Sequence, residues 1–534
     1  MQELHVQLAW NRLLAIVEEQ AQVLMRTAFS TVVREAGDLS AGVFDLDGRM
    51  LAQAVTGTPG HVNSMADAVG KFLQKYPVAV LCPGDVLITN DPWDGTGHLN
   101  DFTVVTPVFN SDRCVALFAS TSHIADVGGR GFGPDANDLF EEGIRVPISY
   151  LFRQGQVDDV LMHLLKANVR DPLVLEGDLY SLTACNDAGA EQLLEMLADL
   201  ALDDLQEVGQ IILQRSRAAM LKEIQELPQG DYRASMTVDG YLEPVTLQAT
   251  VSVKAEQIVV DFAGTSAASN KGINVPLPYT QAYASFGVRC VVGNEVPNNA
   301  GSLDVIEVVA PAGCLVNAQP PRAVSARHSI GQMLPDVVLG CLYQILPDRV
   351  PAEGASCIWN PVFISSVDAE REFVINPIFN GGTGARPTKD GLATTAFPSG
   401  VKTTSTEVNE ATSPLMFMRK EYTAGSGGEG RFRGGLGQTI HIRHIDGASF
   451  VISKMFDRVT HPARGRGGGS SGALGRVFVI DPQGDIQNLP AKGRDEIPVA
   501  ATLVLQTPGG GGLGAAEQRA SSAVAEDQLN GYVD

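Results

Sequence analysis

The spacing of apolar residues changes along the chain and predicts where helices and strands lie. Apolar side chains recur at helical spacing over residues 4–28, which predicts an amphipathic helix. Residues 40–45 and 50–55 form two apolar runs around an Asp-Gly turn, which predicts a β-hairpin. A helix is expected to begin at His61 and to end near Tyr76.

Two copies of one short pattern follow, His98-x-x-Asp101 and His123-x-x-Asp126. Between them, two β-branched apolar runs flank a polar tetrad, which predicts a second hairpin. With the turn centred near Asp112, Asp101 lies directly opposite His123 on one face of the sheet, with Cβ atoms roughly 5 Å apart. A register shift of one residue would turn Asp101 to the other face.

These residue types are the ones that hold a divalent metal ion in proteins. Two imidazoles and one carboxylate can bind such an ion and leave coordination positions open. His98 precedes the predicted strand and could reach the cluster from the preceding loop. The alternative is a hairpin whose histidines make only hydrogen bonds, and the residues alone leave both interpretations open.

The pattern changes after the second hairpin. Residues 157–228 are mainly helical in spacing, whereas residues 232–262 alternate and are rich in Thr and Val, which predicts a sheet. Helices are expected over 281–292 and 329–346, and Pro335 marks a kink or a helix start within the second. The remaining strands are punctuated by glycine.

The predicted fold class is α+β, multidomain, with mixed sheets, helical segments and a glycine-rich β C-terminal part. At 534 residues the chain is too long for a single hydrophobic core. The predicted divisions are an N-terminal α+β domain that holds the candidate metal site (1–186), a helical connector (187–229), a central α+β domain (230–357), a glycine-rich β-dominated domain (358–515) and a flexible tail (516–534).

Glycine is concentrated in four clusters, at residues 381–386, 426–437, 464–475 and 508–514. None contains the Walker pattern for ATP phosphates, and none follows a strand and opens a helix as a dinucleotide-binding loop does. We expect turns and close backbone approach in these clusters. A glycine-lined loop near a substrate or a subunit contact is the alternative.

Composition and charge narrow the possible partners. The net charge of −22 argues against nucleic acid or an anionic membrane as the main partner, so an anionic substrate would need a local positive site. Seven dispersed cysteines without a C-x-x-C pair indicate free thiols in a reducing compartment. No apolar run approaches the ~18 residues of a membrane span, and a cytoplasmic protein is expected.

One further histidine, His328, stands at the entrance of a predicted helix, beside Ser325, Arg327 and Ser329. A helix N-terminus with these neighbours could receive an anion. A capping role is the alternative.

The segment TNDPWDGTGHLNDFTVVTPVF, followed by SHIADVGG, resembles the signature of the hydantoinase B/oxoprolinase family. Further blocks of that family are resembled in the same order, from about residue 34 to 514: REAGDLSAGVFDLDGRMLAQ, VPNNAGSLDVIEVVAPAGCLVN, ARHSIGQ, GGTGAR, SGGEGRFRGGLGQ and TPGGGGLG. The resemblance therefore covers nearly the whole chain.

The resemblance implies a metal site and a partner. A hydantoinase A-type ATPase with an actin-like fold would phosphorylate the substrate oxygen, and this chain would hold a divalent metal, zinc or manganese, and complete the reaction. Carried over by position, the ligands are His98, Asp101 and His123. Asp38 is a fourth, in a block whose family form ends in Asp-Phe-Ser where this chain has Asp-Leu-Ser. Asp126 would orient an imidazole or accept a water proton, or else cap a turn.

The activity implied is the ATP-dependent opening of a small cyclic amide, such as a hydantoin, oxoproline or a lactam, by a hetero-oligomer of A-type and B-type chains. The alternative is a ketone carboxylase that acts on a phosphoenol and activated bicarbonate. A non-catalytic scaffold ranks last, because all the ligand positions are present.

Overall fold

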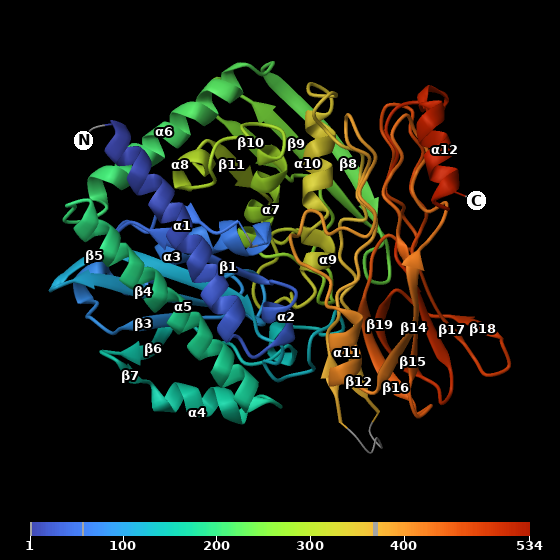
Figure 1. The fold of residues 1–534 in the computed structure, drawn as a ribbon, viewed down its shortest axis with the longest axis horizontal. Helices are drawn as coiled ribbons and strands as arrows, with labels where there is room; N and C mark the ends of the chain where they lie inside the picture. Colours follow the sequence, from blue (N-terminus) through green and yellow to red (C-terminus); the bar gives the residue numbers. More distant parts are fainter. Residues whose placement is uncertain (1–2, 56–57, 367–371, 534) are drawn as a thin grey trace.

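The computed structural model describes residues 3–55, 58–366 and 372–533 (Figure 1). Within these residues the strands form four sheets and the helices pack around them, so the predicted α+β, multidomain class is confirmed. No helix in the described part of the chain is long and apolar enough to span a membrane.

The first sheet contains seven strands in the order β2-β1-β5-β4-β3-β6-β7. Its strands are β1 (Leu39–Phe44), β2 (Met50–Gln53), β3 (Val86–Thr89), β4 (Asp101–Asn110), β5 (Arg113–His123), β6 (Ser149–Arg153) and β7 (Gln156–Val157). Every pair of neighbours is antiparallel. Both predicted hairpins, β1–β2 and β4–β5, are therefore confirmed.

Helices cover both faces of this sheet. The surrounding helices are α1 (Glu3–Thr27), α2 (Thr31–Arg34), α3 (Pro59–Lys75), α4 (Asp159–Ala167), α5 (Pro172–Asp199) and α6 (Gln206–Gln225), with short 3-10 turns η1 (Val78–Val80) and η2 (Leu139–Glu141). α1 and α5 lie side by side over one face, and α3 packs on the other (Figure 1). Because both faces are covered, β4 and β5 are buried at nearly every position, and their apolar residues do not alternate with exposed polar ones.

The second sheet has the order β11-β10-β9-β8 and carries the large central core. Its elements are β8 (Gly230–Val238), β9 (Val245–Val253), β10 (Ile258–Asp261), β11 (Ile306–Val309), α7 (Leu277–Arg289), α8 (Ala300–Leu303), α9 (His328–Gly331) and α10 (Leu334–Leu342). The helix expected over 329–346 is broken into α9 and α10, and Pro335 lies in the first turn of α10, where its missing N–H costs nothing.

Two further sheets make up the C-terminal part, in the orders β13-β12-β16-β19 and β14-β15-β20-β17-β18. Their strands are β12 (Val362–Ser365), β13 (Val374–Ile375), β14 (Leu415–Tyr422), β15 (Gln438–His444), β16 (Phe450–Met455), β17 (Arg476–Ile480), β18 (Ile486–Asn488), β19 (Lys492–Ile497) and β20 (Thr502–Gln506), and helix α11 (Thr406–Thr412) precedes β14. An aromatic and β-branched core lies between these strands.

The glycine clusters pack backbone against backbone beside these sheets. A Cβ on Gly434 would lie 1.9 Å from the carbonyl oxygen of Gly510, and one on Gly382 would lie 1.8 Å from that of Gly435. Hydrogen bonds cross between the same segments, for example from Gly510 N to Gly435 O at 3.0 Å. The expected close backbone approach is therefore present.

The predicted domain limits stay predictions, and one of them falls within a helix. α5 runs through the limit at residue 186. The segment expected to be a flexible tail contains η3 (Ala516–Gln518) and α12 (Ser521–Leu529). Arg519 anchors this segment through bonds to Asp390 at 2.8 Å and to Asp527 at 2.6 Å. The polar composition of the segment gave no sign of these long-range ion pairs.

Candidate metal centre

The candidate ligands meet at one end of the first sheet. Asp38 immediately precedes β1, Asp101 begins β4 and His123 ends β5, and antiparallel neighbours place these three points together. Asp101 pairs directly with His123, as predicted, and the His123 N–H donates to the Asp38 carbonyl oxygen at 3.3 Å.

Three side chains form a tight, buried cluster. His98 Nε2 lies 2.6 Å from Asp101 Oδ1, and His123 Nδ1 lies 3.2 Å from the same oxygen. One ligand atom from each residue lies within 4.8 Å of the others. Only 2% of His98, 0% of Asp101 and 4% of His123 are exposed. The hairpin register thus brings Asp101 opposite His123 as predicted, and His98 joins them from the segment before β4.

His98 is oriented by the segment that precedes α9. Its Nδ1 lies 2.9 Å from the Ser325 carbonyl oxygen and donates there, so Nε2 is the nitrogen that faces Asp101. Burial, together with the nearby Arg327 charge, lowers the pKa of His98 to about 3. His98 is therefore a neutral imidazole at physiological pH, which is the form that binds metal ions.

Asp101 divides its two oxygens between different neighbours. Oδ1 faces the two imidazoles, whereas Oδ2 accepts from Thr96 Oγ1 at 3.0 Å and from the Arg327 guanidinium, and lies 2.9 Å from His61 Nε2. Burial raises the pKa of Asp101, but attraction from His61, His98 and Arg327 outweighs it and holds that pKa well below its usual value. The carboxylate is ionised.

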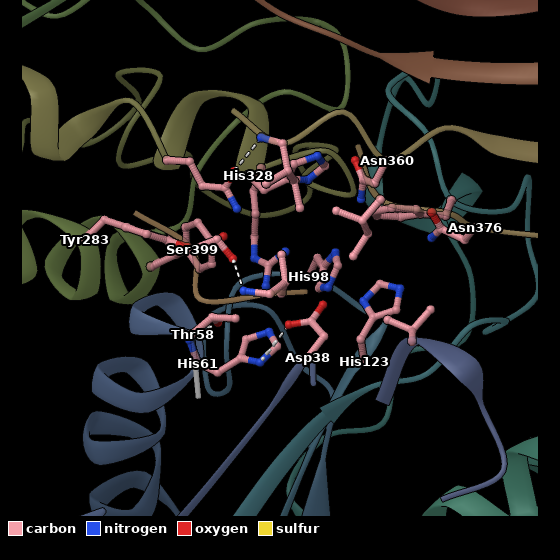
Figure 2. A pocket seen from close by; sticks show the side chains of 18 residues that line it. Asp38, Thr58, His61, His98, His123, Tyr283, His328, Asn360, Asn376 and Ser399 are labelled. Carbon is pink, nitrogen blue, oxygen red and sulfur yellow. Dashed lines mark hydrogen bonds and ion pairs between the residues drawn. The ribbon is translucent and has the colours of Figure 1, made fainter. Parts of the chain in front are cut away.

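Asp38 reaches the same cavity beside His61, which stands in the first turn of α3. Figure 2 shows the Asp38 carboxylate projecting into the cavity, joined to His61 by a dashed line, and Asp38 Oδ1 lies 3.5 Å from His61 Nδ1. Burial lowers the pKa of His61, yet attraction from Asp101 and Asp38 outweighs it, so the pKa is raised overall. His61 thus lies between two carboxylates.

The residues present fit a divalent ion. His123 Nε2 is buried without a hydrogen-bond partner among the described residues, so this nitrogen is free to bind an ion. The cavity that the cluster lines has a volume of about 30 Å³, enough for an ion or a single water molecule. Neutral imidazole and ionised carboxylate are the donors that zinc and manganese accept.

Aromatic rings, Arg327 and His328 also line the cavity. Arg327 stacks on Tyr279, with Cζ 4.0 Å from the ring centroid. The His328 ring packs on Phe132 at 5.8 Å between centroids and lines the cavity. His328 is the first residue of α9, and no side chain caps that helix, so the capping interpretation is not what the structure shows.

Asp126, predicted to assist catalysis or to cap a turn, lies away from the cluster. Its Oδ1 accepts from the Gly128 N–H at 3.0 Å and from Arg170 Nη1 at 2.6 Å. Asp126 is absent from the described residues that line the cavity. Its position matches the turn-capping interpretation, and we assign it no chemical role.

Two functional neighbours, His61 and Arg327, had no assigned role in the sequence. Both contact Asp101, His61 from 40 positions earlier in the chain and Arg327 from 226 positions later. Neither stands at ligand spacing from another candidate. The only signal was that Arg327 lies in a block, ARHSIGQ, that resembles the family.

The fold and site define a mixed α/β chain whose largest sheet presents a buried cluster of two histidines and one aspartate. The model of the family described as hydantoinase B/oxoprolinase matches residues 2–516. The chain belongs to this family, which is a family of enzymes.

One relative is similar to the chain in sequence, and two solved structures share its fold. A chain from a Pseudomonas species, named as the putative B-type component of a D-/L-hydantoinase, is 27% identical over 99% of this chain and 92% of that protein. The fold matches the crystal structure of ATP-dependent caprolactamase from Pseudomonas jessenii with a TM-score of 0.92, at 22% identity over 100% of this chain and 95% of that one. It also matches nucleotide-free acetone carboxylase with a TM-score of 0.89, at 18% identity over 100% of this chain and 78% of that one.

Proposed function

We propose that this chain is the metal-dependent catalytic subunit of an ATP-dependent enzyme that opens a cyclic amide ring. His98, Asp101 and His123 would hold a divalent ion, with Asp38 as a fourth ligand. The observation that carries the proposal is the geometry of Asp101, whose Oδ1 faces two imidazole nitrogens at 2.6 and 3.2 Å in a buried cavity. Family membership supports the same assignment.

A partner subunit completes the proposed enzyme. We propose that a hydantoinase A-type ATPase phosphorylates the amide oxygen and that the two chains form a hetero-oligomer. The Pseudomonas relative is itself named as one component of a larger enzyme, which supports a partner. All seven cysteines are free, which supports a reducing compartment, and we place the enzyme in the cytoplasm.

Phosphorylation of the amide oxygen would make the unreactive ring carbonyl open to attack by water. Amide resonance makes the ring carbonyl a poor electrophile, and O-phosphorylation removes that resonance. Water then adds to the activated carbon, and the ring nitrogen takes up a proton and leaves, which opens the ring to an acyl phosphate. A second water releases phosphate and the carboxylate. A divalent ion bound at the cluster would supply Lewis-acid chemistry and lower the pKa of water.

The residues of the chain would orient the groups around this site and hold a proton. Arg327 and Thr96 fix Asp101 Oδ2, so Oδ1 keeps its orientation towards the two imidazoles. The Ser325 carbonyl oxygen fixes the His98 ring. His61 holds a proton at Nε2, directed at Asp101 Oδ2 at 2.9 Å, and its raised pKa suits a proton carrier.

A second candidate function is the carboxylation of a ketone through a phosphoenol and activated bicarbonate. The fold shared with acetone carboxylase over the whole chain favours keeping it. In that case product formation depends on bicarbonate, and no ring opens.

The metal assignment is tested by metal content. The changes are His98→Ala and His123→Ala, each of which removes one ligand of three. We expect bound zinc or manganese to fall at least about tenfold in each purified variant, because loss of a ligand outweighs the effect of outer partners. Elemental mass spectrometry measures the metal, and circular dichroism checks that the fold persists. His163→Ala, at an exposed position on α4, is the matched control. Full metal occupancy in both ligand variants would refute the site.

A further inference from the structure

A second cavity adjoins the metal centre and has no role so far. Its volume is about 420 Å³, within the range of sites for small organic ligands, against about 30 Å³ for the cavity at the cluster. We call it the outer cleft. Phe132 lines both cavities. The outer cleft thus begins where the inner cavity ends.

The Phe132 ring is the partition between them. Its centroid lies 5.1 Å from that of His123 and 5.7 Å from that of His98, both edge-on. The backbone oxygen of Phe132 accepts from Ser453 Oγ at 3.3 Å, and Ser453 also lines the outer cleft. An inner cavity of about 30 Å³ has no room for a substituted ring, whereas the outer cleft does.

The lining of the outer cleft is positive. Among the described residues, four basic side chains and one acidic side chain line it: Arg130, Lys271, Lys492, Arg494 and Asp135. The surplus of positive charge stands out in a chain whose net charge is −22. A local positive site is what an anionic ligand of such a protein requires.

Two of these cations have only neutral partners. Lys271 Nζ donates to the Asp135 backbone oxygen at 3.1 Å and to Asn137 Oδ1 at 2.9 Å. Arg494 Nη2 donates to the Arg130 backbone oxygen at 3.1 Å. Within the described chain neither forms an ion pair, so their charges are available to a ligand.

The other two cations of the cleft are already paired. Arg130 pairs with Glu141 at 3.1 Å, and Lys492 pairs with the buried Asp457 at 3.0 Å. The Asp135 carboxylate accepts from the Tyr241 hydroxyl at 2.5 Å and keeps its negative charge. Lys271 and Arg494 outweigh that charge, so an incoming group meets a positive balance.

We propose that the outer cleft is the docking site of the activated substrate on its way to the metal centre, where Lys271 and Arg494 hold its phosphoryl group. Lysine acts on phosphate as a point charge, and the arginine fork can bind two of its oxygens. The identity of the ligand rests on the proposed function, because the partner ATPase makes the phosphorylated substrate. The same chemistry would hold free phosphate after release.

Binding of small phosphates to the metal-free, full-length chain tests this proposal. Isothermal titration calorimetry would use inorganic phosphate and phenyl phosphate, with the metal removed so that neither probe can bind an ion. We expect saturable binding of both probes. Tighter binding of phenyl phosphate identifies an organic phosphate as the ligand, and equal binding identifies phosphate itself.

Variants locate the site. Lys271→Met and Arg494→Gln should each raise the dissociation constant about tenfold, because each removes one charged contact to phosphate. Lys254→Met and Arg443→Gln make the same changes at exposed positions elsewhere and should leave binding unchanged. No saturable binding by the natural chain, or equal binding by the two cleft variants, would overturn the proposal.

The phosphate-binding result does not depend on whether the enzyme opens cyclic amide rings. Phosphate binding that is lost in the cleft variants, in a chain that opens no ring with its partner, keeps this inference and rejects the proposed function. Ring opening with an unchanged KM in Lys271→Met and Arg494→Gln would reject this inference and keep the proposed function.

Discussion

Asp101 is the residue on which the candidate centre depends, because each of its oxygens has a separate task. Oδ1 faces His98 and His123, and Oδ2 is fixed by Thr96, His61 and Arg327. A carboxylate with one oxygen held by hydrogen bonds and a guanidinium presents the other in a single orientation. This explains how a fully buried carboxylate stays ionised.

Glu142 supports this arrangement from a distance. Its Oε1 accepts from the N–H groups of Val324 and Ser325 at 2.7 Å each, and Ser325 in turn orients His98. Its Oε2 is buried and has no partner among the described residues. Burial raises the pKa of Glu142 to about 8, although the two N–H donors act against the rise. The neutral acid is therefore favoured in the folded protein.

This residue makes the stability of the protein depend on pH. The folded pKa, about 8, exceeds the usual 4.5, so the stabilising contribution is complete below about pH 4.5 and is lost as pH rises towards 8. Glu142→Gln keeps the acceptor and removes the titration. We expect the free energy of unfolding of the natural chain, relative to Glu142→Gln, to fall between pH 5 and 8 by up to about 1.4 kcal/mol per pH unit, and its melting temperature to fall with it.

Thermal unfolding of both proteins at each pH measures this difference. Glu141→Gln is the matched control at the neighbouring position. There, hydrogen bonds from Asn137 lower the pKa of an exposed carboxyl, so no change is expected between pH 5 and 8. If the melting temperatures of the natural chain and Glu142→Gln changed with pH in the same way, the assignment of Glu142 as a neutral acid would be contradicted.

At the scale of residues, the sequence was informative where contacts are local. The opposition of Asp101 and His123 follows from a hairpin whose turn lies within the same short stretch. His61, Arg327 and Glu142 could not be found this way, because they reach the cluster from other elements through packing that no local pattern records. The repeated His-x-x-Asp pattern was itself misleading, since Asp126 turns away to Arg170.

At the scale of elements, the glycine-rich segments are tightly packed parts of the fold and not loose connecting loops. Their carbonyl groups lie where the side chains of other residues would have to be. Gly434 and Gly382 show the closest approaches, at 1.9 and 1.8 Å from carbonyl oxygens of neighbouring segments to a built Cβ. Such segments accept only glycine.

We predict that Gly434→Ala destabilises the protein by at least about 3 kcal/mol, because a methyl group would overlap the Gly510 carbonyl and the backbone must separate. Gly70→Ala is the matched control. A Cβ at this position on α3 meets nothing within 4 Å. Because alanine is favoured within helices, the control should gain about 0.5–1 kcal/mol. Thermal unfolding compares the two, and equal melting temperatures would show that the segments are not tightly packed.

Periodic elements were predictable, and their ends and interruptions less so. α1, α3 and the two N-terminal hairpins lie where the apolar spacing places them. The division of residues 329–346 into α9 and α10 depends on Pro335, which the pattern could mark only as a kink or a start. The C-terminal helix α12 was missed because its stability comes from Arg519 and its ion pairs with Asp390 and Asp527.

At the scale of the molecule, we propose that this chain is one component of a larger enzyme. The buried cluster would carry the chemistry on the activated substrate, and the outer cleft would dock it. Family membership over residues 2–516 could be recognised from the sequence, because its motifs span the chain. The choice among rings and between hydrolysis and carboxylation lies in contacts that these motifs do not specify.

The most direct test of the central claim is ATP-coupled turnover by the chain co-purified with its A-type partner. Phosphate release and ring opening would be measured with hydantoin, oxoproline and caprolactam, and ketones would be tested with and without bicarbonate. We predict that one cyclic amide is opened with release of phosphate, that the single chain alone is inactive, and that His123→Ala abolishes turnover in the complex. Ring opening by the single chain with ATP, or full turnover with His123→Ala, would contradict the account.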